Sequence, residues 1–66
     1  MKIYLNGNPH DVPEGTSVAV LLNLFAMHTS NVAIEVNTQI VQKARYAETV
    51  LKNGDCIEVV TFVGGG

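Results

Sequence analysis

The sequence predicts a two-layer α+β domain, with one main helix packed on a mixed sheet of four or five strands. Three observations support this prediction. An apolar first segment is followed by Asn6-Gly7, which tolerates the positive φ angles of a tight hairpin turn. A segment with one apolar helical face follows. The remainder consists of short β-branched segments between turn residues, and a single helix can cover one face of such a sheet.

The first hairpin combines a strand at Lys2–Leu5 with a returning strand at His10–Val12. Pro9 belongs at the beginning of the returning strand, because proline has no N–H to donate to a sheet. The two strands are therefore expected to pair antiparallel across the Asn6-Gly7 turn.

The main helix is expected from about Val18 to Met27. Thr16 or Ser17 supplies the side-chain oxygen that caps its first free N–H groups. The segment His28–Asn31 ends it. Residues at the spacing of one helical face form its apolar side: Val18, Leu21, Leu22 and Phe25.

Three further strands are expected at Val32–Val36, Gln39–Val41 and Cys56–Val63. A short helical turn is expected near Glu48–Leu51, and a tight turn at Asn53–Asp55. The helical connection should cross the sheet with the usual right hand, which places the first and last strands side by side at its centre. This order of elements is the ubiquitin-like β-grasp arrangement.

Size and composition favour a binding module over a self-contained enzyme. A chain of 66 residues buries only about 60% of its unfolded surface, which leaves no room for both a core and a deep cleft. Hydrophobic residues make up 47% and charged residues 15%, so the chain is too apolar to be disordered. The net charge is −2, and Lys43 and Arg45 are the only close basic pair. Nucleic-acid binding is therefore not expected.

The cysteine count and the apolar segments indicate a cytoplasmic protein. Cys56 is the only cysteine, so no internal disulfide can form, which fits a reducing compartment. The N-terminal residues lack the apolar core of a signal peptide. No apolar stretch is long enough to span a membrane.

The glycine run Gly64-Gly65-Gly66 is the strongest functional signal. We expect a folded domain over residues 1–63 and a flexible functional tail over 64–66. Glycine has no side chain to block a narrow channel and accepts unusual backbone angles. Such a tail can thread its terminal carboxylate into the nucleotide site of a partner enzyme, anchored by the strand that ends at Val63. The alternatives are a frayed terminus or an expression scar.

Four segments of the chain together form one pattern: Ile3–Gly7, Val36–Val41, Asn53–Asp55 and Thr61–Gly66. On this pattern the whole chain resembles the ThiS family of sulfur carriers in thiamine biosynthesis, which has the ubiquitin-like β-grasp fold. The family needs only the last two glycines, so the resemblance implies that Gly64 is an extension.

The resemblance implies a carrier protein that is not an enzyme and binds no cofactor itself. A ubiquitin-activating-like adenylyltransferase would adenylate the Gly66 carboxylate with ATP. A donor supplied by a cysteine desulfurase would then convert the adenylate to a thiocarboxylate, and thiazole synthase would receive the sulfur. Gly64 and Gly65 would thread into the partner.

An apolar outer surface of the sheet is the predicted partner-binding site. If Ile57, Val59 and Thr61 face the helix, the alternate residues face outward. Scattered surface hydrophobes are the ordinary alternative, but a contiguous patch beside a functional tail favours an interface. Val20 and Leu24 on the helix form a weaker second candidate. The predicted patch comprises Tyr4, Ala33, Val60, Phe62 and Val63.

Other reactive side chains do not form a site. Cys56 stands beside Asp55 and Glu58, whose charges oppose thiolate formation, so we expect an incidental role for it. His10 and His28 lack partners at metal-ligand spacing, so no metal site is expected.

Three alternatives to a thiamine sulfur carrier stay open. One is the carrier subunit for molybdopterin synthesis, another is a ubiquitin-like protein modifier, and a third is a plain interaction module. The short length and the segment Val36–Val41 favour thiamine biosynthesis.

Overall fold

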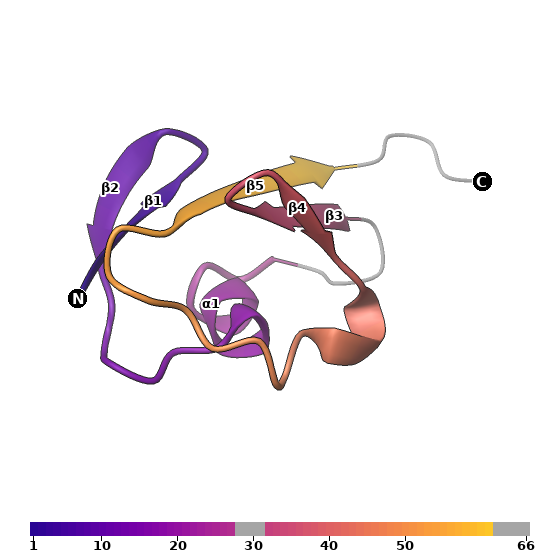
Figure 1. The fold of residues 1–66 in the computed structure, drawn as a ribbon, viewed down its shortest axis with the longest axis horizontal. Coiled ribbons are helices and arrows are strands. Elements are labelled where there is room, and N and C mark those ends of the chain that lie inside the picture. The colour runs from indigo at the N-terminus through magenta and orange to yellow at the C-terminus, as the bar shows by residue number, and fades with distance from the viewer. Residues whose placement is uncertain (28–31, 62–66) are drawn as a thin grey trace.

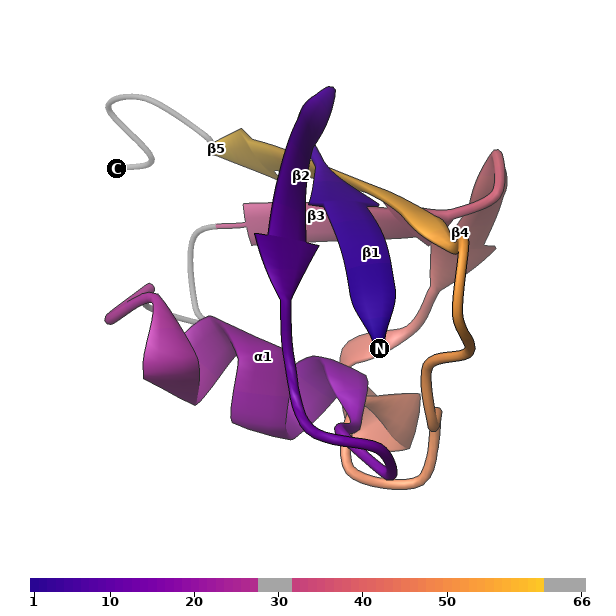
Figure 2. The same cartoon turned by 90° about the vertical axis from the view of Figure 1, so that its left-hand side faces the viewer.

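The computed structural model of the chain describes residues 1–27 and 32–61. Five strands form one mixed sheet in the order β2-β1-β5-β3-β4, and helix α1 lies against one face (Figures 1 and 2). The predicted α+β class with one main helix is thus confirmed. The elements are β1 (Lys2–Leu5), β2 (Asn8–Asp11), α1 (Val18–Leu24), β3 (Val32–Val36), β4 (Gln39–Val41), a 3₁₀ helix (Lys43–Arg45) and β5 (Cys56–Thr61).

The β1–β2 hairpin forms as predicted. Asn6 and Gly7 have φ angles of +49° and +85°, the positive values that a two-residue hairpin turn of type I′ requires. Strand β2 begins two residues earlier than predicted, at Asn8, and ends before Val12. Pro9 therefore lies inside the strand, which is tolerated because β2 is at the edge of the sheet.

Helix α1 begins where the capping residues predicted. Ser17 is the N-cap, and its Oγ accepts the N–H of Val20 at 3.2 Å. Thr16 instead donates its hydroxyl to the Pro13 carbonyl at 2.6 Å, which fixes the turn before the helix. Ser17 is thus the correct choice of the two candidates.

The predicted helix end at Met27 is wrong, since α1 ends at Leu24. Ala26 has a φ angle of +55°, which stops the helix. Its N–H donates to the Asn23 carbonyl at 3.1 Å, and the Met27 N–H donates to the Leu22 carbonyl at 2.8 Å. These two bonds define a Schellman cap with alanine in the position usually taken by glycine. The predicted stop, 28–31, lies outside the described residues.

The last strand occupies the centre of the sheet. Strand β5 pairs parallel with β1, with Tyr4 opposite Cys56, and antiparallel with β3, where Val32 lies opposite Thr61. The predicted pairing of the first and last strands is therefore confirmed. The last two residues of the predicted strand, Phe62 and Val63, lie outside the described residues.

The hydrophobic core lies between the sheet and α1 (Figure 2). Burying one such aliphatic side chain contributes about 1.5–3 kcal/mol. Burial also raises the pKa of the Tyr46 hydroxyl above its ordinary value, because the phenolate would be poorly solvated there. The core residues are Ile3, Leu5, Val12, Val18, Leu21, Leu22, Ile34, Tyr46, Leu51 and Ile57.

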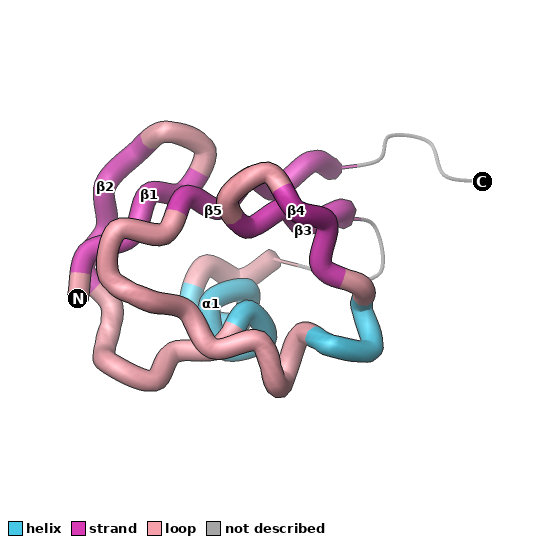
Figure 3. Tube along the Cα trace, in the orientation of Figure 1, coloured by secondary structure: helices cyan, strands magenta, loops and turns pink. Residues whose placement is uncertain are grey.

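The helical turn predicted near Glu48–Leu51 is wrong. The 3₁₀ helix lies earlier, at Lys43–Arg45, and residues 49–51 are not helical (Figure 3). The Leu51 N–H donates to the Thr16 carbonyl at 2.9 Å, and the segment forms an antiparallel bridge with the residues before α1. This long-range pairing satisfies the backbone groups that a local turn would otherwise satisfy.

We predict that Ala26→Gly stabilises the protein. Alanine pays a steric cost in the left-handed region that glycine does not, so the free energy of unfolding should rise by about 0.5–1 kcal/mol. Urea denaturation measures this change. Ala44→Gly is the control, because Ala44 has no positive φ and glycine there should leave stability equal or lower. Equal effects of the two substitutions would contradict the assignment of the cap.

Candidate functional site

The end of β5 is the part of the described structure that leads to the glycine tail. Strand β5 runs through the middle of the sheet toward the C-terminal end of the chain (Figure 1). On one side, β3 pairs with it as far as Thr61. The tail residues Gly64, Gly65 and Gly66 lie outside the described residues, so their predicted role stays a prediction.

The outer face of the sheet brings two of the predicted patch residues together. Ala33 lies directly opposite Val60, whose side chain is 53% exposed. Tyr4 is on the same face, because its neighbours in β1 are buried toward the helix. However, Tyr4 lies opposite Cys56, roughly 13 Å before Val60 along the strand direction. Phe62 and Val63 lie outside the described residues, so the structure does not place them in the patch.

Two carboxylates occupy the middle of this outer face. Glu35 of β3 lies directly opposite Glu58 of β5, a like-charge pair that is unfavourable in a sheet. Ile40 of β4 lies opposite Glu35 and is 73% exposed. The outer face thus has apolar groups around an acidic centre. Sequence reasoning missed Ile40 and the acidic pair, because strand alternation indicates a face but not the register between strands.

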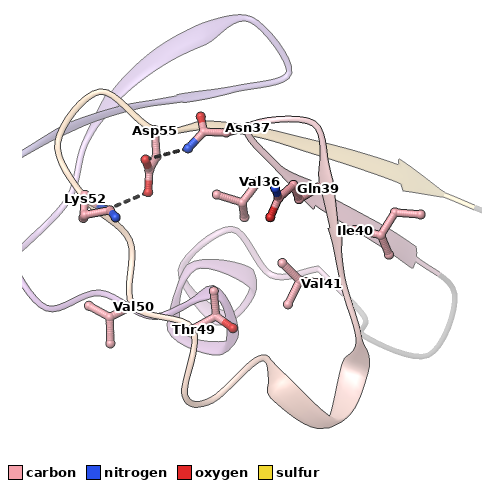
Figure 4. A pocket seen from close by; sticks show the side chains of 9 residues that line it. All are labelled: Val36, Asn37, Gln39, Ile40, Val41, Thr49, Val50, Lys52 and Asp55. Carbon is pink, nitrogen blue, oxygen red and sulfur yellow. Dashed lines mark hydrogen bonds between the residues drawn. The ribbon is translucent and has the colours of Figure 1, made fainter.

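A hydrogen-bond network anchors the beginning of β5 (Figure 4). The buried Asp55 carboxylate accepts the side-chain amide of Asn37 at 2.9 Å and the backbone N–H of Lys52 at 2.8 Å. The Asn37 side-chain oxygen in turn accepts the N–H of Cys56 at 2.9 Å. The β3–β4 turn is thereby tied to the first residue of β5.

A shallow cavity of about 370 Å³ lies beside this network (Figure 4). The side chains of Val36 and Val41 contribute to its apolar side, and Lys52 and Asp55 contribute polar groups. It is located near the beginning of β5, whereas the tail follows the other end of that strand.

The reactive side chains considered from the sequence are dispersed. Cys56 is exposed, with its Sγ 3.9 Å from the Gly54 carbonyl oxygen. The His10 ring packs edge-on against Phe25, with the ring centroids 4.7 Å apart. His28 lies outside the described residues. Within 1–27 and 32–61, no three His, Cys, Asp or Glu side chains come together to hold a metal ion.

In the part of the chain that the structure describes, no helix has the length and apolar character needed to cross a bilayer.

The fold matches a solved structure over its full length. The crystal structure of a thiamine biosynthesis protein (ThiS) from Geobacter metallireducens superposes with a TM-score of 0.85 at 30% sequence identity, covering 100% of both chains. The fold is therefore that of a small ThiS-like β-grasp carrier protein.

Sequence comparison assigns the family. The family model described as the ThiS family matches residues 3–66. The sulfur carrier protein ThiS of Bacillus subtilis is 37% identical over 65 residues, which are 97% of this chain and 98% of that protein. The chain belongs to the ThiS family, the sulfur carrier proteins of thiamine biosynthesis.

A longer relative contains the same module. A thiazole synthase of Magnetococcus marinus is 44% identical over 66 residues, which are 100% of this chain but 20% of that protein. The chain thus spans about a fifth of the length of this relative. The remaining four fifths of that protein have no counterpart in this chain.

We predict that Asp55→Ala strongly destabilises the fold. The substitution leaves the Lys52 N–H and the Asn37 amide without their acceptor, and hydrogen bonds to a charged group contribute about 1.5–3 kcal/mol. Urea denaturation measures the loss. Asp11→Ala is the matched control, since Asp11 is exposed on the edge strand and should change stability by less than about 0.5 kcal/mol. Similar losses in both variants would contradict the anchoring role of Asp55.

Proposed function

We propose that the carboxylate of Gly66 carries the sulfur. The observation that carries this proposal is the family match, which extends over residues 3–66 and so includes the glycine tail. The strand before the tail is paired on both sides, which supplies a rigid anchor for the segment that the partner enzyme would bind.

The chemistry follows from the low reactivity of a carboxylate. A Gly66 oxygen attacks the α-phosphate of ATP in a ubiquitin-activating-like adenylyltransferase, and pyrophosphate leaves. A persulfide derived from a cysteine desulfurase then attacks the acyl carbon, and AMP leaves. A thiol cleaves the resulting S–S bond, which releases the thiocarboxylate and a disulfide between donor and thiol. The carrier is a substrate in this sequence, and its partners bring ATP and sulfur.

We further propose thiazole synthase as the acceptor of the sulfur. The support is the Magnetococcus marinus thiazole synthase, in which a segment 44% identical to this chain makes up 20% of the protein. A carrier and an acceptor that act together gain effective concentration when they are joined in one chain. We expect the same interaction between this carrier and a thiazole synthase, whether the two are separate proteins or joined in one chain.

The proposed partner surface is the apolar outer face at the end of β5. Ala33 and Val60 lie side by side there, and Val60 is more than half exposed. Phe62 and Val63 follow in the sequence toward the tail. Tyr4 is on the same face, but it lies beyond the Glu35–Glu58 pair, toward the beginning of β5. A partner that binds this face also contacts the strand that precedes the tail in the sequence.

The modification of Gly66 is tested by intact mass. After incubation with the adenylyltransferase, ATP and a sulfur donor, the protein should gain the mass of one oxygen-to-sulfur exchange on its last residue. A variant without Gly65 and Gly66 should remain folded by circular dichroism and acquire neither AMP nor sulfur. Cys56→Ser should accept sulfur normally. An unmodified wild-type terminus would refute the proposal, and higher-mass conjugates would support a protein modifier instead.

We predict that Val60→Asp weakens binding of the adenylyltransferase by about tenfold or more, because it places a charge in an apolar interface. Isothermal titration calorimetry measures the affinity. Thr61→Asp is the matched control, since Thr61 is also exposed and adjacent but points to the opposite face of the strand. Equal affinities of the two variants would place the interface elsewhere.

A further inference from the structure

We propose that Asn6 is a positioning residue that holds the end of β5, and so the origin of the glycine tail, in register for activation of Gly66. This inference rests on the proposed function of Gly66. The Asn6 side-chain oxygen accepts the N–H of Val59 at 2.8 Å, and its amide nitrogen donates to the Val59 carbonyl at 3.4 Å. Its backbone N–H also donates to the Ile57 carbonyl at 2.8 Å.

These contacts continue the β1–β5 ladder beyond the end of β1. Parallel pairing proceeds from the Tyr4 N–H, which donates to Asp55, to the Asn6 N–H, which donates to Ile57. The next position on β5 is Val59, but the chain turns away into the hairpin at Asn6 and Gly7. The side-chain amide of Asn6 takes the place of the missing peptide group, because it has the same donor and acceptor.

The position of this contact gives it a functional consequence. Among residues 1–27 and 32–61, Asn6 is the last group that bonds to β5 on its β1 side, whereas β3 pairs with the other side as far as Thr61. Without the amide, the last residues of β5 are held by one neighbour only. The partner enzyme would then have to order them at the expense of binding free energy.

The turn alone does not require this amide. Glycine or aspartate also adopts the positive φ of Asn6 in a two-residue hairpin turn. The contact with Val59 is therefore an additional role, and substitutions can separate it from turn formation. Asn6→Gly removes the amide, whereas Asn6→Asp keeps the oxygen that accepts the Val59 N–H.

Asn53 offers a matched control at the other end of β1. Its side-chain oxygen accepts the backbone N–H of Lys2 at 2.8 Å, so Asn53→Ala also removes one asparagine-to-backbone contact. That contact is located at the beginning of β1, beside the turn that precedes β5, where the Gly54 N–H donates to the Lys2 carbonyl at 2.7 Å. A rise in the KM for the carrier that comes from lower stability should appear in both variants. A rise that comes from the loss of the Val59 contact should appear only in Asn6→Gly.

The experiment measures pyrophosphate release by the adenylyltransferase with each variant as the carrier substrate. Asn6→Gly should raise the KM for the carrier about tenfold and leave kcat within about twofold, because the bound carboxylate reacts normally. Asn6→Asp should have an intermediate KM, and Asn53→Ala the KM of the wild type. Hydrogen exchange of the Val59 amide should accelerate in Asn6→Gly and not in Asn53→Ala.

The outcomes separate the two proposals. Absence of adenylation of the wild-type chain overturns the proposed function and the role of Asn6 with it. If the wild type is adenylated and Asn6→Gly and Asn53→Ala have equal KM values, the role of Asn6 alone is overturned. A fall in kcat of Asn6→Gly without a rise in its KM overturns that role too.

Discussion

The parallel pairing of β1 and β5 is the interaction on which the rest of the structure depends. It joins residues about fifty positions apart at the centre of the sheet, so β2 can attach only outside β1, and β3 and β4 only outside β5. Asparagine side chains lengthen the ladders around β5 where the backbone turns away, with Asn6 bonded to Val59 and Asn37 to Cys56. These side chains thus add hydrogen bonds to β5 at positions where the neighbouring backbone provides none.

Local signals predicted most of the elements, whereas a left-handed residue and one long-range pairing caused the two wrong predictions. The alternation in Val32–Val36 and the side-chain cap at Ser17 each have a local cause, and both were read correctly. The end of α1 is predicted wrongly, because nothing in the sequence indicates that Ala26 adopts the left-handed conformation. The 3₁₀ helix was misplaced because residues 49–51 pair with the segment before α1, a partner that sequence reasoning cannot see.

The candidate site divides in the same way. The predicted role of Gly66 and its neighbours comes from their residue type alone, because the proposed chemistry excludes side chains near the reacting carboxylate. The opposition of Glu35 and Glu58, in contrast, depends on the register between two strands. Asn6 was missed for another reason: Asn-Gly is fully explained by the hairpin, so its second contact leaves no trace in the pattern. A residue whose type is fully explained by a local turn can also make a long-range contact that the sequence pattern does not indicate.

The central location of β5 also determines how the domain resists force. A pull applied beyond Thr61 acts along the axis of a strand bonded on both sides, so it loads these hydrogen bonds together in shear. An edge strand such as β2 would instead peel away one bond at a time. A partner that pulls on the C-terminal end, as the proposed function requires, would therefore act on a strand that resists the pull with hydrogen bonds on both sides.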